Sequence, residues 1–170
     1  MQNNRLADVK SLLKQGADPD EADDQGYTPL IIAAREGYNS IARALIEYKA
    51  DINKPDRDGN TPLIWSVTNT HAPSIQTFLD AGADTDKLGM RGTALMCAAG
   101  GGHGWIVRLL LDKGANPHIR DAAGNTAYSL AEKKNMKATM QMLKEASSKH
   151  KHQQVQNFAK QKKLKIGPKP

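Results

Sequence analysis

The sequence has 170 residues, of which 39% are hydrophobic, and this is enough to bury one core of ordinary size. No apolar run reaches the roughly 18 residues that span a bilayer, so we expect no membrane helix in this sequence. The single cysteine, Cys97, excludes an intrachain disulfide and a cysteine cage for zinc. These features favour a cytoplasmic protein, with export left open because the N-terminal segment looks incomplete.

The net charge of +6 belongs to one end of the chain. Residues 1–146 hold 17 Lys/Arg and 18 Asp/Glu, a sum of −1, whereas residues 147–170 hold seven lysines and no acidic residue, a sum of +7. We therefore expect an almost neutral body, residues 1–146, and a flexible basic tail, residues 147–170.

A helix is expected first over residues 6–13, as the second helix of a half repeat at 5–22. Alone, it would expose Leu6, Val9 and Leu13. Two interpretations stay open here, a further segment upstream or a ragged end of the fold.

From residue 18 onward the sequence repeats with a period of 33, which is typical of stacked repeat proteins. The repeating positions are Asp18, Asp51 and Asp84, and Thr28, Thr61, Thr93 and Thr126, with one step of 32 between Thr61 and Thr93. Each unit consists of a turn with a glycine, a threonine that can cap a helix, a short apolar helix (30–35, 63–68, 95–100) and a second helix.

Glycines at positions 16, 82 and 114 are expected to end the second helices in the left-handed conformation. Lys49 stands in that place in one unit, at a cost of about 1 kcal/mol. Thr70 stands where a glycine is expected between two helices, and Arg91 stands at the turn glycine of the shortened unit.

Three segments carry a family resemblance: Gly-Tyr-Thr-Pro-Leu-Ile-Ile-Ala-Ala (26–34), Gly-His-Gly-Trp-Ile-Val (102–107) and Leu-Leu-Asp-Lys-Gly-Ala-Asn (110–116). With them, residues 5–145 resemble the ankyrin-repeat family. The resemblance implies an all-α solenoid of stacked helix-turn-helix units joined by short β-hairpin fingers. It also implies four repeats that begin near residues 23, 56, 88 and 121.

The sequence departs from the family where a histidine usually follows Thr-Pro-Leu. Ile31, Ile64, Met96 and Ser129 stand there, so packing must replace the histidine hydrogen bonds between repeats. In the last repeat, Lys134-Asn135 aligns with the usual Gly-His.

Proteins of this family usually bind partners on the concave face formed by fingers and first helices. By register, that face contains a set of candidate partner-binding residues: Asp24, Gln25, Tyr27, Arg35, Glu36, Arg57, Asp58, Asn60, Trp65, Thr68, Asn69, Met90, Gly92, Gly100, Gly101, Asn125, Glu132 and Lys133. Trp65 could equally fill a gap between helices. Trp105 lies on the normally polar convex side, where we expect the tail or a partner to cover it.

Other motifs have simpler interpretations. The acidic run from Asp18 to Asp24 could bind a basic peptide or satisfy turn amides. The glycine-rich segment at 100–104 lacks the preceding strand of a phosphate-binding loop, and Cys97 lacks a supporting histidine, so we expect a core thiol.

No combination of nucleophile, base and orienting group is evident, and we expect no enzyme activity and no cofactor or metal. The sequence therefore predicts a monomeric adaptor or regulator that binds another protein. The alternative is a protein that binds nucleic acid or an anionic membrane surface through its lysine-rich tail.

Overall fold

The computed structural model describes the backbone of residues 2–165 and the side chains of residues 5–150 and of Gln156. Within these residues the fold contains helices α1 to α9 and no strand, which confirms the all-α solenoid. A single helix, α1 (Gln2–Lys14), precedes four helix pairs. They are unit 1, α2 (Pro29–Glu36) and α3 (Asn39–Glu47); unit 2, α4 (Pro62–Thr68) and α5 (Ala72–Asp80); unit 3, α6 (Ala94–Gly101) and α7 (Gly104–Asp112); and unit 4, α8 (Ala127–Lys133) and α9 (Lys137–Lys165).

The repeated threonines start the first helix of every unit. The side chain of Thr28 accepts a hydrogen bond from the amide of Ile31, and Thr93 makes the same bond to Met96, each at 3.2 Å. Such a cap satisfies one of the helix amides that has no partner within the helix. The predicted helix starts are thus confirmed, and Ile31 and Met96 are almost fully buried.

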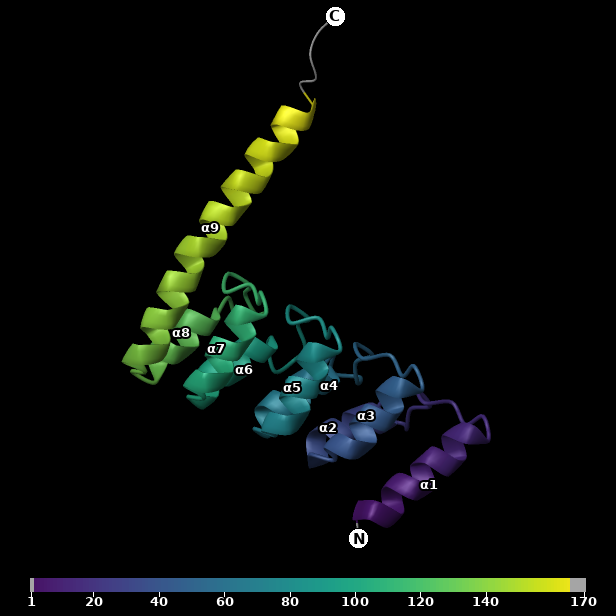
Figure 1. The fold of residues 1–170 in the computed structure, drawn as a ribbon. Helices are drawn as coiled ribbons and strands as arrows, with labels where there is room; N and C mark the ends of the chain where they lie inside the picture. Colours follow the sequence, from purple (N-terminus) through teal and green to yellow (C-terminus); the bar gives the residue numbers. More distant parts are fainter. Residues whose placement is uncertain (1, 166–170) are drawn as a thin grey trace, which may run out of the picture.

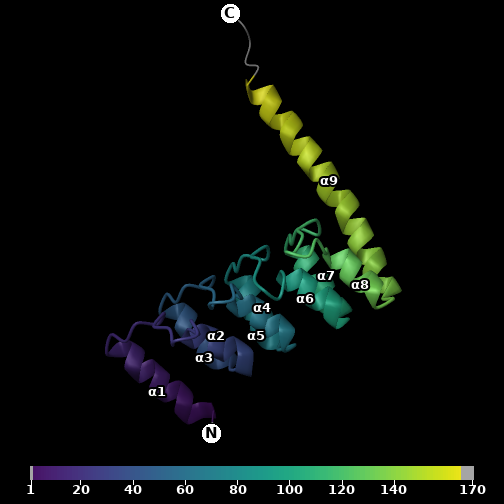
Figure 2. The same cartoon turned by 180° about the vertical axis from the view of Figure 1, so that it is seen from behind.

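The helices form a row that runs from α1 at one end to α9 at the other (Figures 1 and 2). The first helices α2, α4, α6 and α8 pack against one another in succession, more closely than the second helices do. A row that is tighter on one layer curves toward that layer, as the predicted concave face requires.

The fingers, residues 23–27, 56–60, 89–92 and 121–125, are turns and not the expected β-hairpins. In the second finger the amide of Asp56 donates to the carbonyl of Asn60 at 3.0 Å, and the others close similarly. The third finger contains an isolated antiparallel bridge, between Gly89 and Gly92. So few residues cannot build a ladder, and successive fingers are instead joined by bonds such as that from the amide of Met90 to the carbonyl of Asp58, 2.8 Å.

The shortened unit keeps its turn by moving the left-handed residue. Gly92, with φ of 90°, takes the role that register assigned to Arg91. Because glycine has no Cβ, the left-handed conformation costs little at position 92. Arg91 is therefore not required to adopt this conformation in the turn.

Three other residues take the left-handed conformation without being glycine. Lys49 (φ 69°) and Thr70 (φ 59°) do so as predicted. In unit 4 the residue is Asn135 (φ 54°), so the alignment of Lys134-Asn135 with Gly-His was wrong by one residue. Position 135 lies 33 residues after Gly102, which ends α6 in the same conformation, so the period itself places the left-handed residue there, and asparagine tolerates this conformation better than lysine does.

Helix α1 is only partly covered by the stack. Leu13 is buried, and Leu6 and Val9 are half-buried, so the expected exposure of these three residues was too great. The exposed apolar residue is Leu12, at 55%.

The boundary predicted at residue 147 falls inside α9, which continues to Lys165. No glycine or proline interrupts the sequence until Gly167, and Lys, Gln and Ala favour the helix. Its 29 residues correspond to about 43 Å, and Figure 1 shows its second half leaving the stack. Flexibility of this segment stays a prediction, and residues 166–170 lie outside the described part of the chain.

We expect Lys49→Gly to stabilise the protein by about 1 kcal/mol, because it removes the Cβ clash of a left-handed residue. Urea denaturation followed by circular dichroism measures the effect. The control is Lys144→Gly, inside α9, which should destabilise the protein by about 1 kcal/mol. Equal effects of the two replacements would contradict the prediction.

Candidate functional site

A row of two aromatic side chains with an arginine at each end crosses the first-helix face. The guanidinium of Arg35 lies 5.2 Å from the ring centre of Tyr27, whose ring meets that of Trp65 edge to face at 5.9 Å. The guanidinium of Arg91 then lies 4.3 Å from the Trp65 ring centre. Each contact is attractive, because the ring faces carry negative potential. The row joins α2, α4 and the first and third fingers.

A buried carboxylate anchors this row from beneath. Asp56 is 6% exposed and accepts hydrogen bonds from Trp65 Nε1 at 2.8 Å, from the amide of Asn60 at 2.8 Å and from the amide of Asp58 at 3.0 Å. A buried carboxylate is tolerated only when donors satisfy it in this way. The indole ring therefore has a fixed position and fixes the finger that carries Asp56.

The structure exposes, at least in part, all but two of the candidate partner-binding side chains. Asn60 is 1% exposed and Trp65 is 8% exposed, so these two offer little surface to a partner. Their contacts are internal, since Asn60 Oδ1 accepts from the amide of Arg91 at 3.2 Å. The exposed candidates include Met90, at 78%. Of the three candidate glycines, Gly92 is buried, Gly100 is half-buried and Gly101 is exposed, and they can offer backbone alone.

Arg35 connects unit 1 to unit 2. Its side chain pairs with Glu36 at 3.0 Å, and that hydrogen bond raises the pKa of Arg35. Its carbonyl accepts from Asn69 Nδ2 at 3.0 Å and lies 2.9 Å from Nε2 of His71. In unit 4, Lys133 donates to Asn125 at 2.7 Å, so the predicted residues there also form a pair.

Sequence reasoning missed Arg91 as a part of this face. It was noticed only as a replacement of a turn glycine, and the ring contact with Trp65 joins two units of the stack. The sequence did place Arg91 next to Met90, a candidate residue of this face, and this was a signal for including it. Its contact with Trp65 could not be predicted, because that contact depends on how the units pack.

The acidic run and the glycine-rich segment have structural roles. Asp18 and Asp23 accept hydrogen bonds from turn amides, as the simpler interpretation predicted. Gly102 ends α6 in the left-handed conformation, and a helix precedes this segment. In the described part of the chain, no three His, Cys, Asp or Glu side chains gather as metal ligands.

Cys97 is a half-buried thiol on α6. Its Sγ lies 3.2 Å from the carbonyl of Arg91, and burial raises the pKa of the thiol. Because the thiolate is the reactive form, these surroundings oppose use as a nucleophile.

Trp105 on α7 is 50% exposed, and the tail does not cover it within the described residues. Cover by a partner stays a prediction.

No helix in the described part of the chain is both long and apolar enough to cross a membrane. The cytoplasmic location also stays a prediction.

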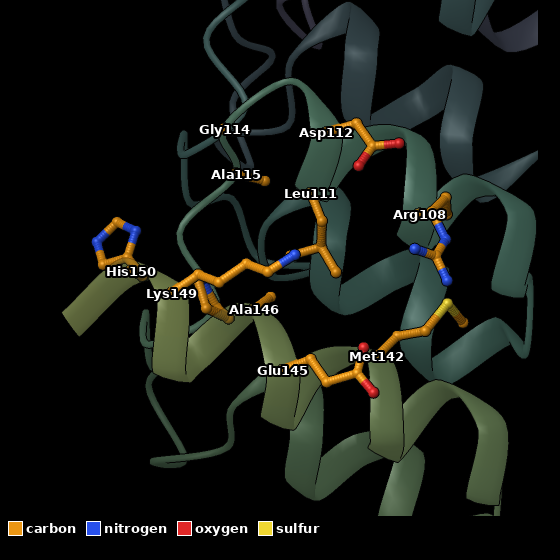
Figure 3. A pocket seen from close by; sticks show the side chains of 11 residues that line it. Arg108, Leu111, Asp112, Gly114, Ala115, Met142, Glu145, Ala146, Lys149 and His150 are labelled. Atoms are coloured by element: carbon orange, nitrogen blue, oxygen red, sulfur yellow. The ribbon is translucent and has the colours of Figure 1, made fainter. Parts of the chain in front are cut away.

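A hollow of about 240 Å³, lined by charged and apolar side chains, lies between α7 and α9. Figure 3 shows Arg108 and Asp112 on its α7 side and Glu145 and Lys149 on its α9 side. Both charge signs occur on both walls, so the hollow favours no anion or cation. None of the predicted partner-binding residues lines it, and its lining contains no cysteine, serine or threonine.

Comparison with known proteins identifies the same kind of repeat as the stacked helix pairs do. A family model described as "Ankyrin repeats (3 copies)" matches residues 1–88 and 70–155. A putative ankyrin repeat-containing protein of Treponema pallidum (strain Nichols) is 32% identical over 122 residues, which cover 71% of this chain and 30% of that protein. Ankyrin repeat and KH domain-containing protein mask-1 of Caenorhabditis elegans is 33% identical over an alignment of 163 positions, covering 76% of this chain and 6% of that protein.

A shorter match concerns protein phosphatase 1 regulatory subunit 27 of Homo sapiens, 50% identical over 44 residues, which are 26% of this chain and 29% of that protein. The chain thus spans less than a third of the length of each of these relatives.

Trp65→Phe should lower the free energy of unfolding by about 1–3 kcal/mol, because the buried Asp56 carboxylate loses a donor. Trp105→Phe is the matched control and should change it by less than about 0.5 kcal/mol, since this ring is half exposed. Denaturant titration compares the two. Similar losses at both positions would mean that the bond to Asp56 contributes nothing specific.

Cys97 should react with iodoacetamide more slowly at pH 8 than a free cysteine does, because its raised pKa leaves less thiolate. The rate should rise as pH increases and reach half its maximum above the pH found for free cysteine. Protein unfolded in urea provides the control and should react like the free amino acid. A folded-state rate equal to that control would contradict the conclusion that partial burial makes the Cys97 thiol unreactive.

Proposed function

Because the chain belongs to the ankyrin-repeat family, we propose that it is a non-enzymatic adaptor or regulator that binds a protein partner on its first-helix face. Ankyrin repeats generally mediate contacts between proteins, and one relative is named as a regulatory subunit of a phosphatase. That name describes the relative only, and the partner of this chain is of unknown identity.

The observation that carries the proposal is the row Arg35, Tyr27, Trp65 and Arg91. Tyrosine and arginine side chains contribute much of the energy of protein interfaces, and here Arg35, Tyr27 and Arg91 offer the accessible surface, whereas the buried Trp65 supports them. Here ring contacts and the buried Asp56 already hold them in place, so less conformational entropy is lost when a partner binds. The exposed Met90 and Asn69 would extend the contact on either side of the row.

One copy of the chain carries the whole face, and we propose that a single copy is sufficient to bind the partner. Charges of both signs occur on it, among them Arg57, Asp58, Glu36 and Glu132. A mixed surface suits a folded or extended protein better than a nucleic acid, which selects clustered positive charge.

The alternative from the sequence, binding of nucleic acid or an anionic membrane by the basic end of α9, stays a prediction. The dependence of binding affinity on salt concentration distinguishes the two proposed functions. Affinity from charge alone falls steeply as ionic strength rises, whereas a packed protein interface is much less sensitive.

The test uses the partner captured by the full chain from its source cells, then purified and titrated against variants. Arg35→Ala combined with Arg91→Ala should weaken binding more than about tenfold, which is roughly 1.4 kcal/mol. Removing residues 151–170 should leave the affinity within about tenfold, since the last described contacts of α9 with the stack end at His150.

Arg108→Ala, on the exposed side of α7, is the matched control and should bind normally. Melting curves establish that each variant is folded. If the tail truncation abolishes binding while the double arginine variant binds normally, the adaptor proposal fails and the charged-tail alternative replaces it.

A further inference from the structure

The α1 end of the stack carries an apolar groove. Val9 and Leu12 of α1 line one side, and Pro29 and Ile32 of α2 line the other. Leu12 is 55% exposed and Ile32 is 39% exposed, and the larger hollow measures about 440 Å³. Clustered apolar exposure of this kind marks interaction sites on folded proteins.

The repeat shows which kind of element fits this groove. The residues in register with Ile32 are Trp65, Cys97 and Leu130, and each is buried or half-buried. Leu130 of α8, for example, lies against Gly100 of the preceding first helix, α6. Ile32 lacks such a neighbour among the described residues. The groove is therefore continuous with the stacking interface, and a helix is the element that this interface accepts.

The edge of the groove is acidic. Asp18, Glu21 and Asp23 line one part of it and Asp8 another, and all four side chains are exposed. Asp18 and Asp23 accept bonds from backbone amides, which are neutral, so their negative charge remains. The lining also holds Arg5, which donates to the neutral hydroxyl of Tyr38 at 2.9 Å and keeps its positive charge, so four carboxylates outweigh one guanidinium at this edge. A positively charged helix complements this edge.

The chain itself contains such a helix at its other end. Residues 151–165 of α9 carry five lysines and no acidic residue. Figures 1 and 2 show this extension pointing away from the stack, at the end opposite to α1. A helix of about 12–15 residues without packing partners is only marginally stable in water. Its sequence also places Val155, Phe158 and Ala159 at helical spacing, as a small apolar stripe.

We propose, in place of the monomer expected from the sequence, that the α9 extension of one copy docks into the α1/α2 groove of a second copy. Groove and extension lie at opposite ends of one chain, so they meet between two copies. The contact is heterologous and leaves a free groove and a free extension at the two ends of every pair. Assemblies of this kind grow into longer chains as concentration rises. The proposal does not depend on the partner of the first-helix face.

The experiment uses the full chain and two variants, after nuclease treatment. The groove variant is Leu12→Ser with Ile32→Ser, which removes apolar surface without changing charge. The extension variant replaces Lys160, Lys162, Lys163 and Lys165 by Glu. Trp105→Ser is the matched control, because it removes an apolar side chain of similar exposure, 50%, away from both sites.

Sedimentation velocity from about 1 µM to about 1 mM measures the mass of each protein. The unaltered chain should grow in mass with concentration. Both site variants should weaken self-association at least about tenfold, and the control should remain within about twofold of the unaltered chain. Raising the salt from about 0.05 to 0.5 M should also weaken it, since charge contributes to the contact. Circular dichroism of each variant confirms the fold.

Mixing the two site variants gives the decisive result. The mixture retains one intact groove and one intact extension, so it should form a one-to-one complex although neither variant associates alone. A monomeric unaltered chain overturns the proposal. So does association lost only in the groove variant, which means that grooves pair with each other, or lost only in the extension variant, which means that the extension docks elsewhere.

Discussion

Small side chains at one position of every first helix set the spacing on which this fold depends. Ala33, Ser66, Ala98 and Ala131 occupy that position, and each is at most 1% exposed. The distance between packed helices follows the size of the residues at their contact, so these residues let α2, α4, α6 and α8 lie close together. The second helices are packed less closely, and the row can curve toward the first-helix face.

Close spacing of the first helices also brings side chains of different units into contact. Tyr27 of unit 1 reaches Trp65 of unit 2, and Arg91 of unit 3 reaches the same ring. The buried carboxylate of Asp56 then fixes the ring through Nε1. Stability and the proposed function share these residues, because the contacts that hold neighbouring units together also fix the positions of Arg35 and Arg91.

Three surfaces of the chain differ in their charge. The first-helix face is mixed in sign, the edge of the α1/α2 groove is acidic, and the extension of α9 is basic. A stack has two ends as well as a face, and a helix that lies uncovered at an end exposes the surface that its neighbours bury. Ile32 illustrates this, since its counterpart Trp65 is 8% exposed and Ile32 itself 39%.

Much of the fold followed from the sequence, because the signals are local. The period of 33, the capping threonines and the left-handed positions at Lys49 and Thr70 each depend on a few neighbouring residues, and the structure confirms the conformations. The form of the fingers, the left-handed conformation of Gly92 and the continuity of α9 depended on the geometry of the folded chain and not on these motifs. The sequence also indicated the candidate face by register. Only the tertiary structure determined that Trp65 and Asn60 are buried and that Arg91 belongs to the face, because burial and ring contacts depend on neighbours about 33 residues away, brought close by the stacking of the units.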